Sequence, residues 1–216
     1  MELTAYLTSL SFLQLFSRMP AAAAQGILWG LMALGVFITF RVLDIADLTV
    51  DGSFATGGAV TVMLLLAGWP AWAALLAALA AGVLTGLVTG ELHTRFGIPV
   101  ILSGILTQFA LYSINLRIMT KANQTASIKK FGTIWDPATH GKGFLVSSLY
   151  IPQAIVVGLL LAVLVIALLY CYFGTEHGSA MRATGSNPAM SRALGINTNR
   201  FKVLGLGLSN GLVTLA

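Results

Sequence analysis

"IPQAIVVGLLLAVLVIALLYCYF", residues 151–173, contains no charged side chain and is the most apolar run of the sequence. An α-helix rises about 1.5 Å per residue and the hydrocarbon core of a bilayer is about 30 Å thick, so about 20 such residues cross it. The whole chain agrees with this, since 57% of its 216 residues are hydrophobic and 9% are charged, against roughly 25% charged residues in a soluble domain. The sequence therefore predicts an integral helical membrane protein.

Further apolar windows lie on both sides of this span. Residues 21–40, 69–90 and 98–118 are each long enough to cross a bilayer, whereas residues 54–67 are too short to cross alone. Residues 3–16 indicate a retained helix that spans or lies on the membrane, because no Lys or Arg precedes them as in a cleaved signal peptide. We expect an all-α, polytopic transmembrane helical bundle that forms one domain over residues 1–216.

The end of the sequence and its polar composition add further expectations. Residues 203–216 are apolar but give only about 21 Å of helix, so we expect a truncated chain with further transmembrane helices to follow.

The net charge of +5 comes without a run of like charges, which argues against nucleic-acid binding. Cys171 is the single cysteine, which excludes a disulfide framework within the chain.

Three aspartates, Asp44, Asp47 and Asp51, lie in the polar stretch before residues 54–67. On a continuous helix they would share one face and resemble the aspartate-rich magnesium site of membrane prenyltransferases, although the sequence lacks the second acidic cluster that such enzymes use. Alternatively the stretch is a broken helix, in which Asp51 and Ser53 cap a short helix near Phe54. An ordinary capped loop fits as well, and these alternatives stay open.

Residues 174–202 carry the signals of short helices. Asn187 is a favourable N-cap, Pro188 fits the first helical position, and Gly195 is suited to the residue after the end, which together predict a helix over residues 188–194. Residues 179–184 predict one or two further turns ended by Gly185.

Basic residues outnumber acidic ones in residues 174–202, where four cations accompany Glu176 alone. The cations are Arg182, Arg192, Arg200 and Lys202. Because cytoplasmic loops carry an excess of Lys and Arg, we expect this segment on the cytoplasmic face.

The stretch "GTEHGSAMRATGSNPAMSRALGIN", residues 174–197, resembles the cytoplasmic coupling segment of bacterial ABC-importer permeases of the branched-chain amino acid and ribose type. The match is carried by Thr175, Gly178, Ala180, Arg182, Ala183, Gly185, Asn187, Ala193, Gly195 and Ile196. Residues 26–60 are similar to the first conserved region of this family. Residues 96–123 resemble a subgroup of permeases for tryptophan or related amino acids.

This resemblance implies a set of partners. In the family two permease subunits associate with two cytoplasmic ABC ATPases and an extracytoplasmic substrate-binding protein. Residues 188–194 would then be the coupling helix that docks on the ATPase, and residues 174–202 the coupling segment. The ATPase-coupling residues implied are Gly178, Arg182, Ala183, Gly185, Asn187, Pro188, Ala193 and Gly195.

The sequence lacks the motif of a nucleotide-binding P-loop. It contains no G-x-x-x-x-G-K-[ST], so we expect no P-loop nucleotide site in this chain. The resemblance then implies a permease of the bacterial inner membrane, without a cofactor or enzymatic activity of its own and with ATP bound by the partner subunit. Such a permease would move a small solute, an amino acid or a related compound, by alternating access. Its partners would include the lipid bilayer but no nucleic acid.

Candidate substrate-pathway residues are polar side chains near the expected break and on the helix that follows it. They are Thr49, Asp51, Ser53, Ser103, Thr107 and Gln108. Ser103 and Thr107 are four residues apart and share a helix face, although hydrogen bonding between helices explains them equally well. The alternatives are a magnesium-dependent prenyl- or phosphotransferase that uses Asp44, Asp47 and Asp51, or an ion-coupled secondary transporter.

Overall fold

The computed structural model describes residues 12–120, 144–146, 149–151 and 153–216. Within these ranges the helices are α2 (Phe12–Phe37), the π-helix η1 (Ile38–Val42), α3 (Val50–Leu66), α4 (Ala71–Thr94), α5 (Val100–Met119), α7 (Gln153–Phe173), α8 (Glu176–Ser186), α9 (Pro188–Ala193) and α10 (Thr198–Thr214). A short antiparallel hairpin of β1 (Phe144–Val146) and β2 (Leu149–Ile151) pairs Phe144 with Ile151. The predicted helical fold class is confirmed. Most of the helix predicted over residues 3–16 lies outside the described residues.

Four of the described helices are long and apolar enough to cross a membrane. They are Ala22–Val42, Ala71–Thr94, Val100–Met119 and Ile155–Phe173, and they correspond to the four predicted spans. Pro70 and Pro99 stand immediately before α4 and α5, where their fixed φ and missing N–H suit a helix start. The predicted short apolar segment is α3, which begins four residues before Phe54.

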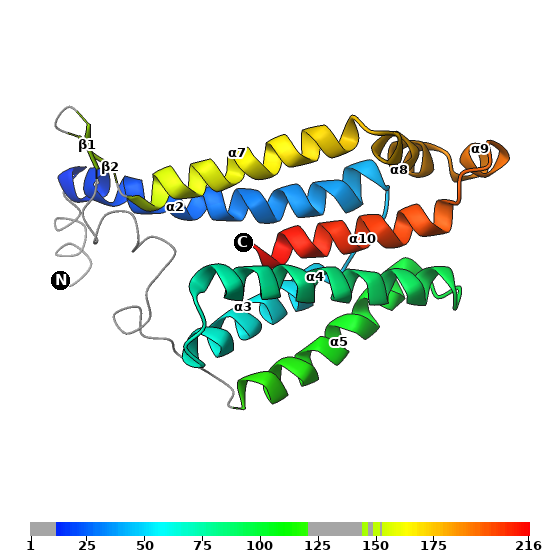
Figure 1. Ribbon diagram of the computed structural model, residues 1–216, viewed down its shortest axis with the longest axis horizontal. Coiled ribbons are helices and arrows are strands. Elements are labelled where there is room, and N and C mark those ends of the chain that lie inside the picture. The colour runs from blue at the N-terminus through cyan, green and yellow to red at the C-terminus, as the bar shows by residue number, and fades with distance from the viewer. Residues whose placement is uncertain (1–11, 121–143, 147–148, 152) are drawn as a thin grey trace, which may run out of the picture.

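Helix α10 occupies the middle of the bundle. It packs on α4, α2 and α3, while α7 lies beside α2, and α5 lies beside α3 and α4. Figure 1 shows α7 and α2 along one side of α10, with α4, α3 and α5 along the other. The short helices α8 and α9 lie together at one end of the bundle (Figure 1). The chain thus arranges its long helices around a central one that starts directly after α9.

Small residues allow α4 to approach α10 closely. A side chain at Gly86 would collide with the backbone of α10 at Leu206 and Gly207, and one at Gly82 would collide with Thr214. In lipid the hydrophobic effect gives little drive for helices to associate, so packing between small residues supplies much of the attraction.

Gly86→Ala is expected to destabilise the bundle, because its methyl group has no room against the α10 backbone. Overpacking of this kind costs about 1–3 kcal/mol. Gly58→Ala is the matched control, since Gly58 also lies within a helix but has open space where the methyl group would go. Denaturant-induced unfolding in detergent micelles measures both, and equal free energies of unfolding would contradict the close packing of α4 on α10.

Candidate functional site

The bundle contains an interrupted helix between α2 and α3. The backbone first widens into η1, where Leu43 N donates to Ile38 O at 3.1 Å and Ile45 N donates to Thr39 O at 3.0 Å. Residues 44–49 then run without helical structure, and Asp44 adopts a left-handed φ of 54°. Leu43, Ile45 and Thr49 are buried here, so this segment is packed between helices.

Asp47 forms a turn immediately before the helix that follows the interruption. Its Oδ1 accepts from Thr49 N at 2.8 Å, and its Oδ2 accepts from Asn210 Nδ2 of α10 at 2.7 Å. The prediction that Asp51 and Ser53 cap this helix is wrong, because α3 starts at Val50 and both residues lie within its first turns. One carboxylate therefore fixes the backbone just before α3 and joins it to α10.

Hydroxyl groups of α3 and α4 extend this contact into a buried cluster. Ser53 Oγ lies within hydrogen-bond distance of Asn210 Oδ1 and of the Thr49 carbonyl, and Thr85 Oγ1 donates to it at 3.2 Å. Thr49 Oγ1 and Thr89 Oγ1 are 2.9 Å apart. We call Asp47, Thr49, Ser53, Thr85, Thr89 and Asn210 the polar cluster. Because each of its members has a partner, the cluster can lie among apolar helices at little cost.

The structure divides the six predicted pathway residues into three groups. Thr49 and Ser53 are fully buried members of the polar cluster. Ser103 and Thr107 are buried, and their hydroxyls donate to carbonyls of their own helix at 2.8 and 2.9 Å. Asp51 and Gln108 line a cavity between α3 and α5. Their contact with a substrate stays a prediction.

This cavity has a volume of about 360 Å³. Asp51, Gly52 and Ala55 line it from α3, and Gln108, Phe109, Tyr112 and Asn115 line it from α5. Sequence reasoning missed Asn115, and it also missed Asn210 of the polar cluster. Both are amides within apolar helices, which was the available signal, but only the folded chain shows which helix each one faces.

The three aspartates do not form a metal site. Asp47 is engaged by Thr49 and Asn210, Asp51 lines the cavity between α3 and α5, and Asp44 lines a separate hollow beside α8. Among the described residues no group of three or more His, Cys, Asp or Glu side chains could hold a metal ion. The alternative in which the three aspartates share one helix face is excluded, because the chain from Asp44 to Thr49 is not helical.

The predicted capped helix within residues 174–202 is confirmed as α9. Asn187 Oδ1 accepts from Met190 N at 3.0 Å, Pro188 occupies the first turn, and Gly195 has a φ of 82° after the end. A similar cap starts α8, where Thr175 Oγ1 accepts from Gly178 N at 3.4 Å. The capping residues in the sequence therefore predicted the position of this helix correctly.

Gly185 has a different role from the predicted one. It does not end the preceding turns, because α8 runs from Glu176 to Ser186. A side chain at Gly185 would collide with the backbone of Val42 and Leu43 in the interrupted helix. Nearby, Arg182 Nη2 donates to the carbonyl of Phe173, the last residue of α7, at 3.0 Å. Helix α8 is therefore packed directly on η1 and on the end of α7.

A basic contact joins α10 to α4 at this same end. Lys202 Nζ lies 3.4 Å from His93 Nε2, and His93 Nδ1 lies 2.9 Å from the carbonyl of Ile98. Because an ammonium group only donates and a carbonyl only accepts, this geometry fits the neutral imidazole with its proton on Nδ1. Burial lowers the pKa of Lys202, and the positive charge of Arg192 lowers it further.

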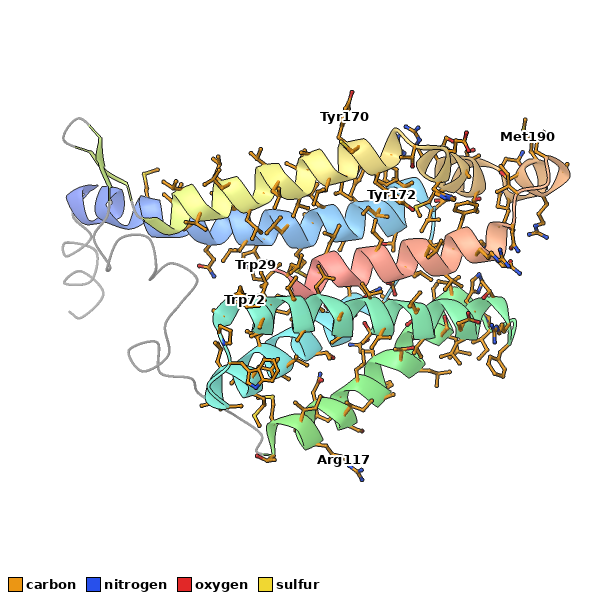
Figure 2. The ribbon with its side chains drawn as sticks, viewed as in Figure 1. Trp29, Trp72, Arg117, Tyr170, Tyr172 and Met190 are labelled. Carbon is orange, nitrogen blue, oxygen red and sulfur yellow. The ribbon has the colours of Figure 1, made fainter. Side chains whose placement is uncertain are left out.

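Helix α9 projects from the end of the bundle with apolar side chains exposed. Met190 and Leu194 are 61% and 67% exposed, and Figure 2 shows Met190 at the extreme end of the molecule. In contrast, Met181 of α8 is completely buried against Ile38 and Leu206. Segment 174–202 thus has an anchored part, α8, and a projecting part, α9. The predicted coupling residues Ala183 and Ala193 belong to α8 and α9 respectively.

Removing the amide of Asn210 is expected to destabilise the protein, because Asn210→Leu leaves Asp47 without its donor from α10. Asp47 is partly buried, so the loss of this donor should cost about 1–3 kcal/mol. Asp47→Leu combined with Asn210→Leu should cost less than the sum of the single changes by about 1 kcal/mol or more. Unfolding in micelles measures this coupling, and strictly additive effects would contradict the contact. Ser113→Ala, at an exposed hydroxyl, is the control.

Comparison with known proteins identifies a family that this chain matches over most of its length. The family described as branched-chain amino acid transport system / permease component matches residues 19–216. A tyrosine transport system permease protein of Clostridioides difficile (strain R20291) is 37% identical over 200 residues, which cover 93% of this chain and 63% of that protein. The uncharacterized protein RP368 of Rickettsia prowazekii (strain Madrid E) is 30% identical over 194 residues, covering 90% of this chain and 64% of that protein. No solved structure matches the chain.

The chain spans a little under two thirds of the length of these two relatives. The family match confirms the expected resemblance and the expectation of a permease component of a transport system. With its four candidate spans, it also confirms a multi-pass protein of the bacterial inner membrane. The chain belongs to the family of permease components of branched-chain amino acid transport systems.

Proposed function

We propose that this chain is the transmembrane permease subunit of an ATP-driven importer for an amino acid or a related small solute, and that it works by alternating access. The observation that carries the proposal is α9. This helix is capped at its start, ended by a glycine of positive φ, and exposes Met190 and Leu194 beyond the bundle. A capped helix with exposed apolar side chains is suited to docking in a groove of another protein.

The proposed partner at α9 is a cytoplasmic ABC ATPase, which binds the ATP, so the permease itself needs no cofactor. A second permease subunit and an extracytoplasmic substrate-binding protein complete the importer. Segment 174–202 lies on the cytoplasmic face in this proposal, which its excess of Arg and Lys supports.

The packing of α8 offers a route from the ATPase to the membrane helices. Movement of α9 would be passed to α8, which contacts the backbone of Val42 and Leu43 through Gly185. The interrupted segment that follows leads to Asp47 and the start of α3. A displacement at the ATPase surface can thus reach the cavity between α3 and α5 through contacts between rigid elements.

The substrate class rests on the family and on one relative. The family consists of permease components for branched-chain amino acids, and the relative from Clostridioides difficile is named for tyrosine transport. The proposed pathway comprises Thr49, Asp51, Ser53, Ser103, Thr107 and Gln108. Of these, Asp51 and Gln108 line a cavity large enough for an amino acid, and the other four are buried on α3 and α5 or just before α3, outside the cavity lining.

Met190→Asp combined with Leu194→Asp is expected to release the ATPase, because two carboxylates would be placed in an apolar groove. Loss of an apolar anchor costs about 2 kcal/mol or more, which weakens ATPase binding about 30-fold. Co-purification of the ATPase with the permease and ATP-dependent uptake in proteoliposomes are the measurements. Both should be lost, while the unfolding temperature of the permease should stay unchanged.

Phe96→Asp serves as the matched control. Phe96 is 74% exposed in the connection between α4 and α5, at the same end of the bundle. It should retain ATPase binding and uptake. If the double variant on α9 binds the ATPase as tightly as this control, α9 is not the docking helix. Uptake that needs a proton or sodium gradient in place of ATP would contradict an ATP-driven importer.

A further inference from the structure

The cavity between α3 and α5 combines a carboxylate with an unsatisfied amide oxygen. Asn115 is 7% exposed, and its buried Oδ1 accepts no hydrogen bond from any described residue. Asp51 makes no ion pair within the described part of the chain, where the ion pair found is between Glu91 and Arg95. Buried polar atoms normally have a partner, so the Oδ1 of Asn115, a residue of the cavity wall, is an acceptor left without a donor.

The lining residues follow the periodicity of the two helices. Asp51 and Ala55 are one turn apart on α3, and Gln108, Tyr112 and Asn115 follow one another along one face of α5. Gly52 lets the helices approach, since a side chain there would meet Gln108 Cα at 3.2 Å. The carboxylate of Asp51 therefore lies near the level of Gln108, which is close to the middle of α5.

A carboxylate at membrane depth is costly unless it faces a cavity, a partner or an ion. Asp51 supplies negative charge, and the amide oxygens of Asn115 and Gln108 can accept hydrogen bonds. No Lys or Arg lines this cavity. Acceptors of this kind suit a cationic donor.

We propose that this cavity is a cation-selective subsite that holds the ammonium group of the solute, with Asp51 as the counter-charge and Asn115 as a further acceptor. The inference rests on the proposed importer of amino acids and adds the group that is recognised within the membrane. The site would reject anionic solutes by desolvation and by repulsion from Asp51. The preference of this cavity for positive over negative charge can be measured on the permease without any transport assay.

The test uses charged thiol reagents on a single reporter cysteine. Cys171, the native cysteine, is first replaced by serine, and Ala55→Cys then places a thiol at the cavity lining. The full chain is held in lipid nanodiscs and labelled with aminoethyl or sulfonatoethyl methanethiosulfonate, each rate being divided by its rate with a free thiol. One carboxylate within several ångströms should favour the cationic reagent by about tenfold or more.

Asp51→Asn in the reporter protein should reduce this preference to about one. Asn115→Asp should increase it, because the variant adds a second negative charge to the same cavity. The control variant is Asp44→Asn, whose carboxylate lines a different hollow, and it should leave the ratio unchanged. The control reporter is Ser113→Cys, an exposed position of α5 outside the cavity lining. Its ratio should not respond to Asp51→Asn.

Protection by a matched pair of solutes tests the ligand chemistry. Phenethylamine and 3-phenylpropanoate have similar shapes but differ in carrying an ammonium or a carboxylate group. Phenethylamine should slow labelling of the Ala55→Cys reporter, and Asp51→Asn should abolish this protection, whereas 3-phenylpropanoate should have no effect. Equal protection by both solutes, protection by neither, or a reagent preference that survives Asp51→Asn would overturn the subsite.

These outcomes are separate from those of the proposed function. A permease that shows the expected reagent preference but fails to bind an ATPase contradicts the importer and leaves the cation-selective subsite. A permease that binds its ATPase through α9 but shows no preference at Ala55→Cys contradicts the subsite alone.

Discussion

The interruption between α2 and α3 is possible only because its polar groups find partners inside the bundle. In hydrocarbon an unsatisfied backbone N–H or C=O costs several kcal/mol, so irregular backbone at membrane depth must be buried in protein or line a cavity. The Asp47 carboxylate satisfies one such backbone group, because one of its oxygens accepts from Thr49 N. Its other oxygen accepts from Asn210 Nδ2 and holds the segment against α10. The position of α3, and with it the cavity lining, depends on this pair of contacts.

Helix α10 connects this contact to the other end of the bundle. It starts within a few residues of α9 and carries Asn210 along its course, with close packing on α4 at Gly86. Helix α8 contacts the same interrupted segment through Gly185. Segment 174–202 therefore has two mechanical connections to the polar cluster, one through α10 and one through η1. Such a pair of contacts constrains both the tilt of α3 and the shape of the unwound backbone before it.

The features that sequence predicted well are those that local chemistry determines. Apolar length predicted the four spans, and the order Asn187, Pro188, Gly195 predicted α9, because a cap and a helix stop need only neighbouring residues. The features that it missed depend on distant partners. Asp47 and Asn210 are 163 positions apart, so no local pattern shows that the carboxylate before α3 also binds α10. Gly185 fits a helix end by composition, but in the fold it allows close contact with Val42.

The three aspartates show how one break in a helix separates side chains that a continuous helix would align. Asp44 has a left-handed backbone and lines a hollow beside α8, Asp47 accepts hydrogen bonds from Thr49 and Asn210, and Asp51 lies one residue into α3. Because Asp47 already has donors on both oxygens, it is poorly placed to bind a solute. Asp51 has no such partner among the described residues, and it lines the same cavity as Asn115. The division follows from where α3 begins: the carboxylate of Asp47, just before the helix, stabilises the fold, and the next one along the chain is left free to bind a ligand.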